Sequence, residues 1–303
     1  MTLTYCKGQS VKICMNPCHQ RSIILYFCVI FKRIAMKEKV VVITGAASGI
    51  GKALAFECAK RGAKLSLADR NKEQLQAIEE ELRKSGTEVI STETDVTREE
   101  DCKRFISNTI SQFNRIDVLI NNAGISMRAL FEEVDLDVLK RVMDVNFWGA
   151  VYCTKYALPE LLKTRGSVAG VSSIAGYKGL PGRTGYSASK FALQGFLEVV
   201  RIENMKRGLH VLIACPGFTS SNIRNAALAK DGSNQGESPR DEDKMMTPEE
   251  VARQICDAIE KRKHRLIMTS QGKMTVLLNK LFPKFMDKMV YNHMAKEPDS
   301  PFK

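Results

Sequence analysis

Residues 37–268 alternate between short, continuously apolar runs and longer stretches in which apolar positions return every three or four residues. The first pattern is typical of buried parallel strands, and the second of amphipathic helices. Strands are predicted at 40–43, 64–68, 88–94, 117–120, 167–172, 210–215 and 264–268. Helices are predicted from the turn at 44–51 to about residue 61 and at 72–84, 98–113, 136–162, 184–206 and 248–262. The alternation favours an α/β fold, a Rossmann-type doubly wound parallel sheet of about seven strands in a single domain.

The N-terminal segment departs from this pattern. It contains an apolar run at 23–31, flanked by Arg21 and by Lys32 and Arg33. This run is too short to cross a hydrocarbon core of about 30 Å, and no small-residue cleavage site follows it. Three interpretations stay open: sequence upstream of a true start at Met36, a poorly ordered tail, or a weak interfacial anchor. We therefore expect an extension at 1–36, a main domain at 37–269 and a tail at 270–303.

The C-terminal tail has apolar residues at helical spacing between 273 and 294, with lysines at the positions between them. Pro283 is predicted to divide this stretch into two helices. A basic amphipathic tail of this kind suits a membrane surface. Its apolar face could instead cover the substrate cleft or contact a partner subunit, and we favour these two interpretations.

The net charge of +12 is concentrated at the two ends of the chain. Residues 1–35 carry five basic and no acidic residues, and residues 261–303 carry ten basic and three acidic ones. The middle of the chain is therefore neutral, which argues against a nucleic-acid-binding protein. The basic ends leave room for weak peripheral contact with a membrane, and we expect a cytoplasmic protein.

Nine cysteines in 303 residues are too few for a disulfide scaffold. Five of them fall within predicted elements and are interpreted as small buried residues: Cys58, Cys102, Cys153, Cys215 and Cys256. Cys14, Cys18 and His19 form a metal-like cluster, but a second ligand pair at suitable spacing is missing. We therefore expect no metal.

A glycine-rich turn lies between the first strand and the first helix. It places Gly45, Ser48, Gly49, Ile50 and Gly51 where the backbone can approach a diphosphate closely. The N-terminus of the helix that follows adds unpaired N–H groups and a partial positive charge. This turn is therefore a predicted nucleotide-binding loop, although a merely tight turn would look similar.

Asp69 ends the second strand, eighteen residues after Gly51. An acid near this position hydrogen-bonds the ribose 2′-hydroxyl of NAD and repels the 2′-phosphate of NADP. The pattern therefore favours NAD as the cofactor. Arg70 follows directly and could bind that phosphate, so NADP stays possible. Asp69 could also serve simply as a helix cap.

Tyr186 and Lys190 are four residues apart in a predicted helix and share one of its faces. A nearby ammonium favours the phenolate and lowers the pKa of a tyrosine from about 10 toward neutrality. Such a tyrosine can act as a general acid and base. Ser173, at the end of the preceding strand, could hold a substrate oxygen against it.

Five motifs occur in the order found in the short-chain dehydrogenase/reductase family. They are the turn at 44–51, Asp95-Val96, the run at 121–124, Ser172-Ser173 together with the run at 186–190, and Pro216-Gly217. Over residues 38–268 the chain resembles this family. The resemblance implies a catalytic set of Asn146, Ser173, Tyr186 and Lys190. It also implies cofactor contacts from Asp95, Val96, Asn122, Ala123, Gly124, Tyr186, Lys190, Pro216, Gly217 and Thr219.

In the family's arrangement Asn146 would kink its helix and hold a water, and Lys190 would bind the nicotinamide ribose. One departure is that Ser221 stands where threonine is common, and Thr219 lies close enough to serve in its place. The resemblance implies an NAD(P)-dependent oxidoreductase that interconverts a secondary alcohol and a ketone, as a homodimer or homotetramer. A 3-oxoacyl thioester reductase and a nucleotide-binding sensor without turnover are the alternatives.

The connection after Gly217 is expected at the mouth of the cleft, because ligands of open α/β sheets bind beyond the carboxyl ends of the strands. Residues 218–228 are predicted to form a short helix. Residues 230–244 are polar and nearly free of large apolar groups. We interpret them as a lid that orders on binding, with a plain insertion as the alternative.

Overall fold

The structure is a computed structural model and describes residues 2–4, 10–12, 36–219, 227–236, 245–296 and 300. The chain divides into two units, residues 1–34 and 35–303. In the first unit, β1 (Thr2–Thr4) pairs antiparallel with β2 (Ser10–Lys12). Cys14, Cys18, His19 and the apolar run at 23–31 lie outside the described residues. The remaining elements belong to the second unit.

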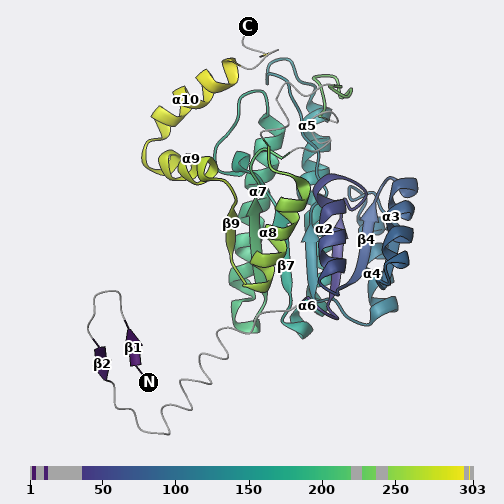
Figure 1. Ribbon diagram of the computed structural model, residues 1–303. Coiled ribbons are helices and arrows are strands. Elements are labelled where there is room, and N and C mark those ends of the chain that lie inside the picture. Colours follow the sequence, from purple (N-terminus) through teal and green to yellow (C-terminus); the bar gives the residue numbers. More distant parts are fainter. Residues whose placement is uncertain are drawn as a thin grey trace. The chain divides into compact units, whose positions relative to one another are not determined.

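The second unit is built on a seven-stranded sheet in which all neighbouring strands are parallel (Figure 1). Its strands are β3 (Val40–Thr44), β4 (Lys64–Asp69), β5 (Val89–Glu93), β6 (Val118–Asn121), β7 (Ser167–Val171), β8 (His210–Cys215) and β9 (Arg265–Ile267). Their order across the sheet is β5-β4-β3-β6-β7-β8-β9. The predicted doubly wound parallel sheet is therefore confirmed.

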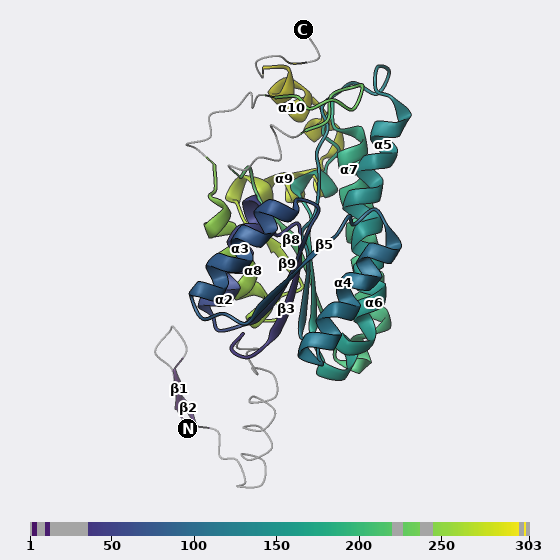
Figure 2. The same cartoon turned by 90° about the vertical axis from the view of Figure 1, so that its right-hand side faces the viewer.

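Helices cover both faces of this sheet (Figure 2). They are α2 (Gly49–Lys60), α3 (Lys72–Lys84), α4 (Glu99–Phe113), α5 (Leu136–Met143), α6 (Gly149–Thr164), α7 (Thr184–Glu203) and α8 (Pro248–Glu260). One buried apolar cluster joins α2, α3 and α8 to the sheet, and a second joins α4, α6 and α7 to its other face. Val41 and Ile43 of β3 belong to the first cluster and Val42 to the second. Burial on both faces explains why this strand reads as a continuous apolar run.

The strand order reverses between β3 and β6. The chain runs outward from β3 through β4 to β5, then returns to place β6 on the opposite side of β3. The connections on either side of this point diverge, and a crevice opens beyond the carboxyl ends of β3 and β6. A ligand of the sheet is expected to bind in this crevice.

The helical stretch predicted at 136–162 is not a single α-helix. A π-helical segment, η1 (Asp144–Trp148), separates α5 from α6 and contains Asn146. Such a segment accommodates one extra residue in a turn and often occurs at functional sites. The helix predicted at 184–206 ends at Glu203, and a 3-10 turn, η3 (Met205–Arg207), follows it.

The short helix predicted at 218–228 is wrong at its described ends. Thr219 forms an isolated β-bridge with Met246, and Leu228 forms one with Met127. The backbone N–H of Leu228 donates to Ser126 O at 2.9 Å, so Leu228 pairs with the loop after β6. Residues 220–226 and most of the predicted lid, 237–244, lie outside the described residues.

Two further helices follow β9, α9 (Ser270–Leu281) and α10 (Pro283–Ala295). Pro283 stands at the first position of α10, where its missing N–H leaves no helical hydrogen bond unmade. The predicted break at this proline is therefore confirmed. Both helices lie toward the carboxyl end of the sheet (Figure 1).

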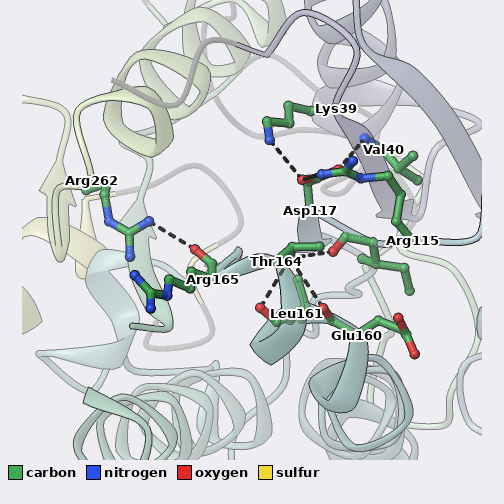
Figure 3. Close-up of polar contacts among 10 residues, drawn as sticks. Lys39, Val40, Arg115, Asp117, Glu160, Leu161, Thr164, Arg165 and Arg262 are labelled. Atoms are coloured by element: carbon green, nitrogen blue, oxygen red, sulfur yellow. Dashed lines mark hydrogen bonds and ion pairs between the residues drawn. The ribbon is translucent and has the colours of Figure 1, made fainter. Parts of the chain in front are cut away.

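The amino ends of the strands are held by a separate polar network (Figure 3). Asp117, directly before β6, accepts hydrogen bonds from Val40 N at 3.0 Å, from Arg115 at 2.6 and 2.8 Å and from Lys39 at 3.1 Å. Burial alone would raise the pKa of Asp117, but these donors outweigh burial and hold its pKa below the usual range. This carboxylate therefore fixes β3 beside β6 at the end opposite the crevice.

Candidate active site

A cavity of about 600 Å³ lies at the carboxyl ends of the strands. Most of the residues predicted as functional line it: Gly45, Ser48, Gly49, Ile50, Asp69, Arg70, Asp95, Val96, Asn122, Ala123, Gly124, Ser173, Tyr186, Lys190, Pro216, Gly217 and Thr219. Gly51 and Asn146 belong to the predicted set but stand behind the lining. The sheet thus gathers residues from six distant parts of the sequence around one cavity.

The turn between β3 and α2 requires its glycines. Gly45 and Gly49 have φ angles of 66° and 50°, in the left-handed region that other residues rarely adopt. A Cβ on Gly51 would lie 1.8 Å from Gly45 O, and one on Gly45 would lie 2.8 Å from Ala123 Cα. The backbone at Gly51 therefore packs directly on Gly45, and Gly45 packs directly on the segment after β6.

The N-terminus of α2 opens toward the cavity through Ser48, Gly49 and Ile50, which line it. Ser48 is the N-cap, and its side chain makes no capping hydrogen bond. No acidic residue stands in the first turn of α2. The partial positive charge of this helix end is therefore available for an anion.

Asp69 ends β4 with its carboxylate turned toward the glycine turn. Its Oδ2 accepts a hydrogen bond from Ala47 N and its Oδ1 from Asn71 N, each at 3.0 Å. The N-cap of α3 is Asn71, whose side chain accepts from Gln74 N. Asp69 is thus not the cap of α3, and it stands in the wall of the cavity beside the exposed Arg70.

Asn122 joins the ends of β3 and β6 at the point where the strand order reverses. Its side-chain amide donates to Thr44 O at 3.0 Å and to Gly45 O at 3.1 Å. In return, the hydroxyl of Thr44 accepts from the backbone N–H groups of Asn122 and Ala123, each at 3.1 Å. These four bonds hold the floor of the cavity in one conformation.

Asn146 connects the loop after β6 to α7. Its Oδ1 accepts from Ile125 N at 2.8 Å, and its Nδ2 donates to Ile125 O at 3.0 Å and to Ser189 Oγ at 2.9 Å. Ser189 Oγ donates in turn to Tyr186 O at 2.8 Å. The π-helical segment carries Asn146 into this position, so the asparagine orders the backbone that presents Tyr186.

Lys190 lies under the tyrosine and is almost entirely buried, with 3% of its surface exposed. Its ammonium donates to Val171 O at 2.9 Å and lies 5.7 Å from the centre of the Tyr186 ring. Burial lowers the pKa of Lys190 from 10.5 to about 8. The predicted approach of Lys190 to Tyr186 is thus present, with the lysine buried.

Ser173 follows β7, at the start of the 3-10 turn η2 (Ile174–Gly176). Its Oγ accepts a hydrogen bond from Ala175 N at 3.2 Å, so the hydroxyl hydrogen remains available to a ligand oxygen. Behind it, Gln194 of α7 donates to Ser172 Oγ at 2.9 Å. Gln194 was missed by the sequence reasoning because a glutamine within a helix has no distinguishing pattern.

The remaining predicted contacts are held by tight packing. A Cβ on Gly217 would lie 2.4 Å from Thr269 Cγ2, and Thr219 Oγ1 donates to Gly217 O at 3.1 Å. Val96 packs closely on Gly149. A Cβ added to Gly149 would lie 2.8 Å from the Cβ of Val96. Ser221, the one departure from the family pattern, lies outside the described residues.

Comparison with known proteins shows the family to which the chain belongs. Residues 39–232 match the family described as short chain dehydrogenase. The chain belongs to this family. It is 43% identical over 187 residues to 11-beta-hydroxysteroid dehydrogenase-like 2 of Arabidopsis thaliana, a match that covers 61% of this chain and 60% of that protein. It is 44% identical over 207 residues to 11-beta-hydroxysteroid dehydrogenase A of Arachis hypogaea, covering 68% and 58%. The chain thus spans less than two thirds of either relative.

A solved short-chain dehydrogenase/reductase has the same fold. The protein from Burkholderia phymatum, in complex with NAD, aligns with a TM-score of 0.75 at 25% identity, over 83% of this chain and 96% of its own. The alcohol dehydrogenase of Thermococcus sibiricus, complexed with 5-hydroxy-NADP, gives a TM-score of 0.67 at 26% identity, over 76% and 94%. Family membership, expected from five motifs, is confirmed.

Several lining residues of this short-chain dehydrogenase were not predicted: Thr94, Thr97, Ile125, Ser126, Leu180 and Arg183. Arg183 stands three residues before Tyr186 and donates to Ser126 Oγ at 2.8 Å. Ser126 follows the predicted run at 121–124 by two residues, so extending that motif would have found it. In the described part of the chain no cluster of three His, Cys, Asp or Glu residues could hold a metal ion.

Proposed function

We propose that this short-chain dehydrogenase is an NAD(P)-dependent oxidoreductase that interconverts a secondary alcohol and a ketone. The observation that carries the proposal is the convergence of Ser173, Tyr186 and the buried Lys190 on the cavity that the glycine turn also lines. A tyrosine beside a lysine is common on protein surfaces, but here both stand at the carboxyl end of a doubly wound sheet.

The cavity fits a dinucleotide. Gly45, Gly49 and Gly51 leave room for backbone approach, and the uncapped start of α2 suits a diphosphate. Asp69 would accept hydrogen bonds from the adenosine ribose, and Asp95 and Val96 would flank the adenine. Asn122, Ala123, Gly124 and Pro216 to Thr219 would line the nicotinamide end. When bound, the nicotinamide supplies hydride chemistry.

The chain's own residues move the proton. Ser173 would donate a hydrogen bond to the substrate oxygen, and Tyr186 would give that oxygen a proton or take one from it. Lys190, held by Val171 O, would bind the nicotinamide ribose and stabilise the phenolate. Fixed positions for these groups reduce the entropy lost on reaching the transition state.

NAD is the favoured cofactor, with NADP still possible. The support is the carboxylate of Asp69 beside Ala47 N, where a 2′-phosphate would meet a negative charge. Arg70 is exposed next to it and is the residue that could reverse this preference. The two solved relatives, complexed with NAD and with 5-hydroxy-NADP, do not distinguish the two cofactors.

An apolar alcohol or ketone is the favoured substrate class. Ile125, Leu180 and Phe218 are among the residues that line the cavity, and the plant relatives are named hydroxysteroid dehydrogenases. A 3-oxoacyl thioester reductase would use the same groups on a different substrate. A sensor without turnover is disfavoured because Asn146, Ser173, Tyr186 and Lys190 are all present.

Turnover with a panel of apolar ketones and secondary alcohols tests the proposal. We expect Tyr186→Phe to lower kcat at least about a hundredfold, the usual contribution of a general acid and base. Cofactor affinity should fall far less than kcat, because the substitution keeps the ring of Tyr186 and leaves the glycine turn and Asp69 in place. Tyr291→Phe, on an exposed helix, is the matched control. Equal turnover by Tyr186→Phe and the wild type would contradict the assigned role.

A homodimer is proposed as the working assembly. Trp148, the last residue of η1, is 44% exposed, and Phe191 of α7 is 47% exposed. The Trp148 ring stacks on that of Tyr152. Exposed aromatic groups of this kind suit a protein interface. Light scattering should give a dimer for the wild type and a smaller species for Phe191→Arg; a wild-type monomer would contradict the assembly.

A further inference from the structure

The two C-terminal helices expose several large apolar side chains. Met274, Leu277, Leu281, Phe282 and Phe285 are 53% to 58% exposed, and Met289 is 41% exposed. These six residues are called the docking face. Contiguous exposed apolar groups indicate a surface that meets something else. These side chains lie on a side of the tail that does not cover the cleft of its own subunit.

The spacing of the docking face forms one stripe on each helix. In α9, Met274, Leu277 and Leu281 are separated by three and four residues, and in α10, Phe285 and Met289 are separated by four. Residues at these separations lie on the same side of a helix. The inward side is different: Met286 and Met294 are the buried side chains of α10.

The docking face is bordered by positive charge. Residues 270–296 contain five lysines and one acid, Asp287. These lysines are exposed. Four of them each directly precede a residue of the docking face and so lie about 100° away from it around the helix: Lys273, Lys280, Lys284 and Lys288. Asp287 forms an ion pair with Lys178 of the main domain. The surface around the apolar stripe is therefore cationic.

Two polar contacts fix the docking face relative to the active site. Besides the Asp287–Lys178 pair, Asn279 of α9 donates to Tyr177 O at 2.9 Å. Tyr177 and Lys178 belong to the loop between Ser173 and Tyr186. The α9–α10 pair is thus held against the catalytic loop.

We propose that the docking face binds the surface of an anionic lipid bilayer. A short basic helix with an apolar side inserts that side among the acyl chains while its lysines meet anionic headgroups. A second copy of the chain is a poorer occupant, because a two-fold contact through this face would place lysines opposite lysines. No helix among the described residues is long and apolar enough to cross a membrane.

Vesicle co-sedimentation of the whole protein tests this proposal. The probes are phosphatidylcholine vesicles with and without phosphatidylglycerol. We expect binding to the anionic vesicles that weakens as salt is added. The triple variant Leu277→Ser, Leu281→Ser, Phe285→Ser should lower the partition coefficient at least about tenfold, because three acyl-facing groups are lost. Lys280→Gln, Lys284→Gln, Lys288→Gln should weaken binding to anionic vesicles only.

The control carries equally exposed apolar groups elsewhere. Val199 and Ile202 on α7 are 53% and 64% exposed, and Val199→Ser, Ile202→Ser should leave the partition unchanged. The proposal is overturned if the triple variant binds vesicles as the wild type does, which would assign binding to residues 1–35. It is also overturned if that variant only changes the oligomeric state, or if anionic lipid makes no difference. These readouts need no turnover, so they are independent of the proposed reaction.

Discussion

Lys190 shows most clearly how a residue of the proposed active site can lower the stability of the fold. Its charge is buried, and its ammonium donates a hydrogen bond to Val171 O. Its pKa in the folded protein, about 8, is below the unfolded value of 10.5. The unfolded chain therefore binds more protons between these values, and burial of the charge destabilises the fold fully below pH 8. The penalty is relieved as pH rises toward 10.5.

Lys190→Met is accordingly expected to stabilise the protein while removing turnover. The charge penalty is about 3 kcal/mol at neutral pH, and loss of the bond to Val171 O offsets about 1 kcal/mol of the gain. We expect a net increase of about 1–2 kcal/mol in the free energy of unfolding. Urea unfolding at neutral pH and near pH 10 measures it. A gain of the same size at both pH values would show that the lysine charge is not its source.

Sequence spacing alone predicted the position of Asp69 but did not decide between a role at the cofactor and a role as a helix cap. Eighteen residues after Gly51 and at the end of a strand, it was expected beside the turn, and its bond to Ala47 N places it there. The alternative, a cap for the next helix, is excluded by Asn71, which caps α3. Gln194 and Arg183 could not be predicted, because their contacts depend on loop conformations that leave no periodic pattern.

Among the elements, the turn between β3 and α2 has the least tolerance for change. Gly51→Ala would place its Cβ 1.8 Å from Gly45 O, a backbone atom that cannot move without opening the turn. We expect cofactor affinity to fall at least tenfold and stability to fall by about 2 kcal/mol, the usual cost of an overpacked position. Calorimetric titration and urea unfolding measure the two effects.

Gly195 provides the matched control for this substitution. It lies within α7, and a Cβ there would meet no atom within 4 Å. Gly195→Ala should therefore stabilise the protein by up to about 1 kcal/mol, because alanine is the better helix former, and should leave cofactor affinity unchanged. If both alanine variants bind cofactor equally well, the turn is not the cofactor cradle.

The strands and most helices could be predicted because their apolar patterns differ so clearly. β3 is buried on both faces and reads as an unbroken apolar run, whereas the helices of the two faces repeat every three or four residues. The η1 segment between α5 and α6 could not be predicted from periodicity. One extra residue in a turn shifts the pattern too little to see, and only the family resemblance implied a kink at Asn146.

At the scale of the whole molecule, the two ends of the sheet differ in structure and role. The carboxyl ends form the cavity, and the amino ends are joined by buried polar groups. His210, at the start of β8, bonds Ser167 Oγ through Nδ1 and Lys263 O through Nε2, each at 2.9 Å. Burial lowers the pKa of His210 to about 4, while the bond to Lys263 O opposes this shift and Arg262 and His264 add to it.

The protein should therefore lose stability as pH falls from about 6.5 to 4. The unfolded chain binds the proton first, since its histidine pKa is 6.5. We expect His210 to account for a loss of about 2 kcal/mol at pH 5, relative to neutral pH. His210→Gln can keep both hydrogen bonds without titrating, so its stability should depend less on pH. Parallel pH dependence of variant and wild type would contradict the assignment.

The central claim is that this fold holds a nicotinamide dinucleotide with Asp69 at its ribose. Calorimetric titration of NADH and NADPH into the wild type and Asp69→Asn tests it most directly. Asparagine can still accept from Ala47 N, so the substitution removes the charge and spares the turn. We expect NADH to bind the wild type about tenfold more tightly than NADPH, and the variant to lose this preference. Tighter binding of NADPH to the wild type would assign recognition to Arg70, and binding of neither would contradict the account.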